Sequence, residues 1–349
     1  MKILDDTKLD FSDLLLLPKR SQYSSREEVN LERNFKFKYS HYSWSGVPIM
    51  VSNMDTTGTI AMALALQKHK VFTCLHKYYK AEDLLDKGLI TDYYAVSTGI
   101  NESDLENLDQ IMKTINPQFI CVDVANGYMS RFIDSCRKIR ERYPEKVIIA
   151  GNVCTSEGVF ELVMNGKVDI VKVGIGSGSC CTTRKQTGIG MPQFSAIMEC
   201  ADTAHGLDAH IISDGGLQVI GDFAKAYGGG ADFVMSGSMF AGHAESGGEL
   251  IEDKLEDGTY KQYKIFYGMS STTAMNKYSG GVASYRTSEG KTVKIEYRGP
   301  IENTILNIKG GVRSCMTYIG AKKIKDIPKC ATFIRVNRQL NQIYNGNEI

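Results

Sequence analysis

The stretch VIIAGNVCTSEGVFELVMNGKVDIVKV, residues 147–173, decides the fold class. It begins with a β-branched apolar run at 147–151, continues through a segment of helical length and period at 156–164, and ends with a second apolar run at 169–173. This order predicts a strand, a crossover helix and a parallel strand, because parallel strands need a long connection between them. Both runs are apolar almost without alternation, which is typical of a sheet covered on both faces.

The same unit recurs between residues 48 and 236, where eight strands are predicted with helical segments between most of them. A count of eight favours a closed (β/α)8 TIM barrel over an open doubly wound sheet. The predicted strands are Pro48–Ser52, Val71–His76, Tyr94–Thr98, Phe119–Asp123, Val147–Gly151, Asp169–Val173, His210–Ser213 and Asp232–Ser236; the predicted helices are Thr59–Lys68, Glu102–Ile115 capped by Asn101, Met129–Arg142, Ser156–Met164, Pro192–Thr203, Gly221–Tyr227 and Ile301–Ile319.

Composition excludes several classes of protein. The 349 residues include 41 Lys and Arg against 40 Asp and Glu, a net charge of +1, and no basic block of the kind that binds nucleic acid or a membrane surface. No apolar run approaches the roughly 20 residues of a membrane span, and Met1–Asp13 does not resemble a signal peptide. Nine cysteines without a CxxC pair favour neither a disulfide framework nor a zinc site. We therefore expect a globular, cytoplasmic protein.

Two long segments interrupt the alternation of strands and helices. Residues 174–191 follow predicted strand six, and residues 242–299 follow predicted strand eight. Long segments inside a compact domain are usually functional, and barrel active sites lie at the carboxyl ends of the strands. We expect one barrel domain over residues 1–349, with an insertion at about 243–299 that acts as an active-site flap.

The first of these segments contains Gly174-Ile-Gly-Ser-Gly-Ser-Cys-Cys-Thr-Thr-Arg184. Alternate glycines let the backbone turn tightly, and a cysteine beside Thr hydroxyls and an arginine is a candidate activated thiolate. A mobile Gly/Ser loop that carries ordinary cysteines explains the composition equally well. The pattern does not decide whether Cys180 or Cys181 would be the nucleophile.

Other candidate site residues also fall at predicted strand ends. Asp214-Gly215-Gly216 and Gly237-Ser238 follow strands seven and eight, where barrel enzymes often bind phosphate; Asp214 suits a ribose hydroxyl pair better than a phosphate. The alternative is two tight turns. Residues 267–271 and 285–291 form a candidate lid, or else a solvated hairpin. No GxGxxG motif or P-loop occurs, so a Rossmann unit is not expected.

Several of these motifs together resemble one family. The pattern G-x-G-S-x-C-x-T at 176–183 resembles the catalytic loop of the IMP dehydrogenase/GMP reductase family, and residues 52–56, 214–216 and 267–271 resemble further motifs of that family in the same order. The resemblance extends from residues 9–13 to 332–335, nearly the whole chain. Ser177 is one departure, since many members have proline there.

Within that family the chain resembles the reductase branch. His76-Lys77 leads almost directly to strand three, without the CBS-type module that the dehydrogenases usually carry at this point. The runs at 181–188 and 286–293 resemble those of reductases. Tyr285-Arg286 has the reverse order of the Arg-Tyr pair on the dehydrogenase flap.

The resemblance implies a reaction and a mechanism. Reductases of the family convert GMP and NADPH to IMP, ammonia and NADP. Cys181 would attack purine C2 to give a covalent thioimidate, and Thr183 with Glu289 would relay a proton to the departing amine. The alternatives are an IMP dehydrogenase that lacks its regulatory module and a non-catalytic barrel that binds purine nucleotides.

The resemblance also implies ligand contacts and an assembly. Ser25 and Arg26 would reach the cofactor of a neighbouring subunit, which implies an oligomer, expected to be a homotetramer. A monovalent cation, typically potassium, would bind carbonyl groups in the catalytic loop. The implied nucleotide contacts are Asp214, Gly215, Gly216, Gly237, Ser238, Gly268, Met269, Ser270, Arg286, Ser288 and Gly290; the NADPH contacts are Lys77, Asp123, Val124, Ala125, Ser314 and Thr317 besides Ser25 and Arg26; the cation carbonyls are those of Gly176, Gly178 and Cys181.

Overall fold

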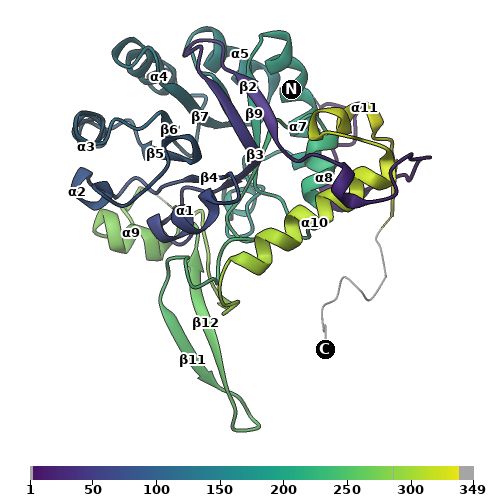
Figure 1. The fold of residues 1–349 in the computed structure, drawn as a ribbon. Coiled ribbons are helices and arrows are strands. Elements are labelled where there is room, and N and C mark those ends of the chain that lie inside the picture. The colour runs from purple at the N-terminus through teal and green to yellow at the C-terminus, as the bar shows by residue number, and fades with distance from the viewer. Residues whose placement is uncertain (1–2, 286, 338–349) are drawn as a thin grey trace.

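The computed structural model describes residues 3–285 and 287–337, and its centre is a closed barrel of eight parallel strands (Figure 1). Each strand pairs with the next along the chain, and the last pairs with the first, with Val234 opposite Ile49. The predicted barrel and its eight strands are therefore confirmed. The strands are β3 (Ser43–Val51), β4 (Val71–Cys74), β5 (Tyr94–Thr98), β6 (Phe119–Asp123), β7 (Val147–Val153), β8 (Ile170–Val173), β9 (His210–Asp214) and β10 (Phe233–Ser236).

A ring of helices covers the outside of this barrel (Figure 1). All seven predicted helices are present, with ends shifted by a few residues at most. Thr155 caps the helix Ser156–Met164 by accepting a hydrogen bond from Gly158 N. Asn101 lies at the N-cap position of the helix Glu102–Thr114, but its side chain does not make the expected hydrogen bond. The ring consists of α1 (Ile60–Gln67), α2 (Ala81–Leu84), α3 (Glu102–Thr114), α4 (Ser130–Arg142), α5 (Ser156–Met164), α7 (Gln193–Gly206), α8 (Gly221–Gly228) and α10 (Glu302–Ile319).

The amino-terminal end of the barrel is plugged by aromatic side chains. β2 (Arg33–Lys36) pairs antiparallel with the start of β3, an element that the sequence pattern missed. Phe35 stacks on Phe233 with ring centroids 4.5 Å apart, and Phe37 lies edge-on to Phe119. These rings belong to the cluster that fills the barrel interior.

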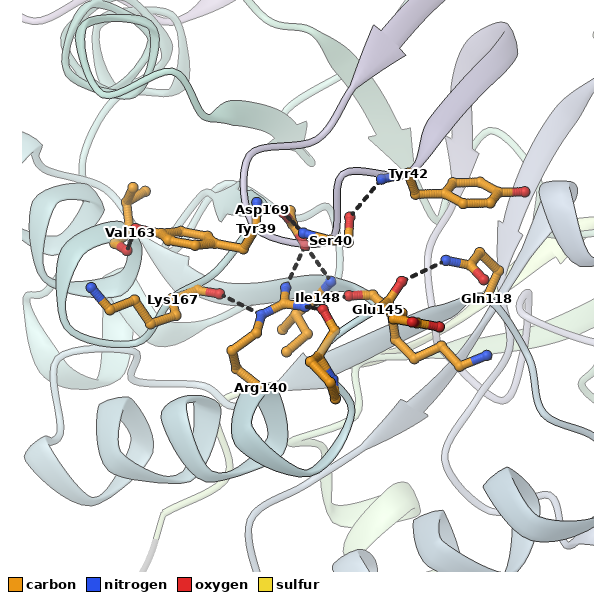
Figure 2. Close-up of polar contacts among 12 residues, drawn as sticks. Tyr39, Ser40, Tyr42, Gln118, Arg140, Glu145, Ile148, Val163, Lys167 and Asp169 are labelled. Atoms are coloured by element: carbon orange, nitrogen blue, oxygen red, sulfur yellow. Dashed lines mark hydrogen bonds and ion pairs between the residues drawn. The ribbon is translucent and has the colours of Figure 1, made fainter.

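A buried carboxylate holds the neighbouring turn in place (Figure 2). Asp169, which lies just before β8, accepts hydrogen bonds from Tyr39 N and Ile148 N at 2.9 and 3.0 Å and pairs with Arg140. Arg140 also donates to the carbonyl groups of Pro144, Lys146 and Lys167. Because the plug and this network close the amino-terminal end, a ligand enters at the opposite end, where the strands finish.

The predicted insertion after β10 contains a small antiparallel sheet that projects from the barrel (Figure 1). Its strands are β11 (Leu250–Lys254), β12 (Tyr260–Tyr267) and β13 (Thr292–Glu296), and α9 (Thr272–Ser279) lies between the last two along the chain. No helix in the described part of the chain is long and apolar enough to cross a membrane.

The remaining elements are short. The segment from Pro328 is expected from the sequence to lie at the surface, and its described residues are exposed or half-buried. It also contains a helical turn and a strand, and Phe333 packs edge-on against Phe194 with ring centroids 4.7 Å apart. These elements are α6 (Thr183–Thr187), α11 (Ile327–Cys330), the paired strands β1 (Leu14–Leu16) and β14 (Phe333–Arg335), and the 3-10 turns η1 (Phe11–Asp13), η2 (Arg26–Glu28), η3 (Thr91–Tyr93) and η4 (Ile324–Asp326).

Candidate active site

A cavity of about 520 Å³ opens at the carboxyl ends of the barrel strands. Its wall combines the ends of the strands, the loop after β8 and part of the insertion. Most of the site residues expected from the sequence line it. They are Lys77, Asp123, Val124, Ala125, Gly176, Gly178, Cys181, Thr183, Asp214, Gly215, Gly216, Gly237, Ser238, Gly268, Met269, Ser270 and Glu289.

A chain of hydrogen bonds connects three of these side chains. The Cys181 thiol donates to Thr183 Oγ1 at 3.1 Å, and the Thr183 hydroxyl donates to Glu289 Oε2 at 2.7 Å. Thr183 begins the short helix α6, which lies in the loop after β8. The arrangement connects a thiol to a carboxylate through one hydroxyl, which is the geometry that a proton relay needs.

The structure separates the two adjacent cysteines that the sequence could not rank. Cys180 is buried, and burial raises the pKa of its thiol. The positive charge of the nearby Lys291 lowers this pKa, but by less than burial raises it. Cys181 is partly exposed, lines the cavity and is hydrogen-bonded to Thr183. A nucleophile must be reachable from the cavity, so the geometry favours Cys181.

Backbone hydrogen bonds hold Glu289 against the loop after β8. Its carbonyl accepts from Thr182 N at 2.8 Å, and its N–H donates to Ser270 O at 3.1 Å. Next to it, Lys291 N donates to Cys180 O at 2.9 Å. A Cβ on Gly290 would lie 2.8 Å from Ser271 N, so glycine at this position allows two segments of the insertion to pass this close to each other. The carboxylate is therefore placed by main-chain pairing with both neighbouring segments.

Asp214 lies at the end of β9, and side chains from two neighbouring strands hold its carboxylate. Asn152 Nδ2 donates to Asp214 Oδ2 at 2.9 Å, and Lys172 Nζ lies 3.3 Å from the same oxygen. Gly215 follows with a φ of 83°, a left-handed conformation that turns the chain sharply after the strand. The turn directs the Gly215 and Gly216 backbone toward the cavity that they line.

The floor of the cavity contains a lysine that sequence analysis missed. Lys172 on β8 is 2% exposed, and its Nζ lies 2.7 Å from Asp123 Oδ1 and 3.2 Å from Asn53 Oδ1. Burial alone would lower the pKa of this ammonium, but Asp123 and Asp214 raise it well above 10.5, so the lysine stays charged. The available signal was one lysine in the apolar run Ile170-Val-Lys-Val173.

Several expected contacts lie elsewhere. Ser25 and Arg26 lie at η2, which packs beside α10, the helix that carries Ser314 and Thr317; none of the four lines the cavity. Ser288 and Gly290 are next to the cavity wall, and the Ser288 hydroxyl donates to Gly290 O at 3.0 Å. Arg286 lies outside the described residues.

Comparisons with known proteins identify the family of the chain. Residues 90–341 match the model of the IMP dehydrogenase / GMP reductase domain. The chain is 54% identical to human GMP reductase 2 over 347 residues, which cover 98% of each chain. It is 53% identical to GMP reductase of Klebsiella pneumoniae over 353 residues, covering 99% of this chain and 100% of the relative, and 53% identical to human GMP reductase 1 over 348 residues, covering 97% and 98%. The family resemblance drawn from the motifs is confirmed.

Proposed function

We propose that this chain, which belongs to the IMP dehydrogenase/GMP reductase family, is an NADPH-dependent oxidoreductase that converts GMP to IMP and ammonia. The family and its reductase relatives support the overall reaction. The observation that carries the mechanism is the continuous contact from the Cys181 thiol through the Thr183 hydroxyl to the Glu289 carboxylate.

The direction of these hydrogen bonds gives the relay two uses. A proton that leaves Cys181 passes through Thr183 to Glu289, which leaves a thiolate in the cavity and a neutral carboxylic acid beside it. The thiolate adds to purine C2, and the acid returns its proton to the exocyclic amine, which departs as ammonia. The product of this half-reaction is a thioimidate between Cys181 and the purine.

Nucleotide recognition falls to the strand ends and the insertion. Asp214 would accept hydrogen bonds from the ribose hydroxyls, since Lys172 and Asn152 hold its carboxylate toward the cavity. Gly216, Gly237 and Ser238 would cradle the phosphate with backbone N–H groups and a hydroxyl. Met269 and Ser270 would contact the base, so the insertion would act as a flap whose Glu289 reaches the amine. Ser288, Gly290 and Arg286 would contact the base as well.

A second group of cavity residues fits a nicotinamide cofactor. When bound, NADPH supplies the hydride that C2 needs after the amine has left. Lys77, Asp123, Val124 and Ala125 would hold it, because they line the same cavity as Cys181. Ser25, Arg26, Ser314 and Thr317 gather away from this cavity, which suits a homotetramer in which they reach a neighbour's cofactor.

The catalytic loop also offers oxygens for a monovalent cation. Gly176 and Gly178 line the cavity, and the Gly178 carbonyl accepts only Cys181 N, at 3.0 Å, among the backbone groups of the described residues. A carbonyl oxygen has a second lone pair, so the donor set fits a potassium ion. The carbonyl groups of Gly176, Gly178 and Cys181 would hold it and so order the loop.

An assay with three nucleotides tests the function. The chain is mixed with NADPH and GMP, IMP or XMP, and with NAD and IMP, in the presence of potassium. Oxidation of NADPH with GMP alone, with ammonia released in equal amount, is the expected result. Reduction of NAD by IMP would instead identify a dehydrogenase, and tight GMP binding without turnover would identify a non-catalytic barrel.

A further inference from the structure

Asp55 lies buried between the barrel and the insertion, in the turn that follows β3. Its Oδ2 accepts hydrogen bonds from the hydroxyls of Tyr267 at 2.5 Å and Tyr278 at 2.6 Å. The same oxygen lies 3.0 Å from Lys277 Nζ. All three donors belong to the insertion, so one barrel carboxylate binds it at several points.

The donors lie on both sides of the segment proposed to contact the base. Tyr267 ends β12 and directly precedes Gly268-Met269-Ser270, whereas Lys277 and Tyr278 lie near the end of α9. This helix adds Ala274, Met275 and Ser279 to the cavity wall. Fixing both positions therefore limits the movement of everything between them.

A stacked aromatic pair adds a second tie to the barrel at the same place. The rings of Tyr278 and Tyr78 lie 3.5 Å apart between centroids and are tilted by only 4°. Tyr78 follows Lys77 and lines the cavity, so the stack joins the proposed cofactor side to α9. Burial and then the hydrogen bond to Asp55 raise the pKa of Tyr278, which keeps its hydroxyl protonated as a donor.

The energetics favour the docked position of the insertion. The Asp55 side chain is 2% exposed, and hydrogen bonds to a charged group are stronger than those between neutral groups. Movement of the insertion away from the barrel would remove all three donors together. The contact is outside the chain of hydrogen bonds from Cys181 to Glu289, so it can act on the position of the insertion without entering the chemistry.

We infer that Asp55 is a positioning residue that latches the insertion over the nucleotide through Tyr267, Lys277 and Tyr278. The inference rests on the proposed function, because it assigns the latch to the GMP side of the reaction. A latch raises the fraction of molecules in the binding-competent form, and apparent affinity falls in proportion when that fraction falls. GMP binding can still pull the insertion closed at saturation.

The test uses the full chain and the variants Asp55→Ala, Asp55→Asn and Tyr278→Phe. Hydrogen exchange of the α9 amides, measured without ligands, is expected to speed up by about tenfold or more in Asp55→Ala, with barrel amides unchanged. The KM for GMP is expected to rise about tenfold while kcat changes by less than about threefold. Asp55→Asn and Tyr278→Phe should show smaller changes, because the first keeps an oxygen acceptor and the second keeps the ring stack.

Asp253→Asn is the matched control. Asp253 also pairs with a lysine of the insertion, Lys294, but on the exposed sheet. It should leave both the α9 exchange and the KM unchanged. The latch would be overturned if Asp55→Ala and Tyr278→Phe kept the parent's α9 exchange rate and its KM for GMP. It would also be overturned if kcat fell at constant KM, because that result indicates a loss of folded enzyme. A parent chain that fails to oxidise NADPH with GMP would refute the proposed function, whereas the exchange measurement would still decide the latch.

Discussion

The Thr183 hydroxyl donates a hydrogen bond to Glu289 at 2.7 Å, although 106 positions separate the two residues along the chain. The contact exists because the segment around Glu289 pairs through its main chain with Thr182 and Ser270. A proton relay that crosses from the barrel to the insertion is complete only when the insertion is docked. In the proposed mechanism, this carboxylate would therefore couple chemistry to closure.

Glu289→Gln tests the relay directly. The amide keeps the size of the side chain but cannot take up a thiol proton or return one to the amine. We expect ammonia release to slow by about 10²- to 10⁴-fold, the usual range for a lost general acid, with GMP and NADPH binding little changed. Single-turnover measurement of ammonia and of NADPH oxidation separates the two steps.

The reverse direction gives a sharper comparison. Starting from IMP and NADP, formation of the thioimidate asks Glu289 only to accept the thiol proton, which water can also accept. This step should therefore survive Glu289→Gln better than the amination that follows it. Glu296→Gln, an exposed residue on β13 that pairs with Lys261, is the matched control. If Glu289→Gln weakened GMP binding as much as it slowed both steps, Glu289 would be a binding residue and the acid would lie elsewhere.

The two adjacent cysteines should behave differently. Cys181→Ala is expected to abolish turnover and leave GMP binding nearly intact, whereas Cys180→Ala should keep most activity because the Cys180 thiol is buried with a raised pKa. Brief treatment with iodoacetamide followed by peptide mass spectrometry should find the label on Cys181 first. Preferential labelling of Cys180, together with an active Cys181→Ala variant, would reverse the assignment.

The barrel was predictable because its strands are short β-branched runs buried on both faces, as at 147–151 and 169–173. The strand β2 was missed since Arg33–Lys36 has only Phe35 as an apolar residue, and that ring is buried by tertiary packing. The surface position expected for the segment from Pro328 holds for its described residues. Its strand β14 was not expected, because it is defined by pairing with β1, far away in sequence.

The site was predictable where loops carry recognisable motifs, as around Cys181 and Asp214. Lys172 and Asp55 were not assigned roles, because their partners come from distant segments. Lys172 meets Asp123 and Asp214 only once the barrel is closed, and Asp55 meets Tyr278 only when the insertion folds back. No periodicity within either segment signals such a contact.

Asp214→Ala should weaken GMP binding by about ten- to a hundredfold, because a hydrogen bond to a charged group contributes roughly 1.5–3 kcal/mol. Titration calorimetry with GMP and with 2′-deoxy-GMP checks the ribose assignment. The variant should lose most of the preference for GMP over the deoxynucleotide that the parent shows. Equal affinities of variant and parent for GMP would remove Asp214 from the nucleotide site.

Lys172→Met removes the positive charge from the cavity floor and leaves Asp123 and Asp214 facing each other. Loss of one partner from a buried ion pair typically costs about 3–5 kcal/mol, so we expect a marked fall in the free energy of unfolding. Because Asp123 and Asp214 are proposed to contact cofactor and ribose, the KM values for NADPH and GMP should both rise. Denaturant unfolding and steady-state kinetics measure the two effects.

The pH dependence and a double variant separate the charge of Lys172 from its bulk. The folded-state pKa of Lys172 is raised, so its contribution to stability is complete below about pH 10.4, the ordinary lysine pKa, and is lost only as the pH rises further. The parent should therefore keep a larger free energy of unfolding than Lys172→Met from neutral pH up to that point. Asp123→Asn added to Lys172→Met relieves the repulsion and should restore part of the GMP affinity. Lys225→Met, which removes a similarly buried lysine paired with Asp222 away from the cavity, should lower stability without changing either KM. If Lys172→Met lowered stability alone and both KM values stayed at the parental level, the lysine would support the barrel without positioning the two carboxylates.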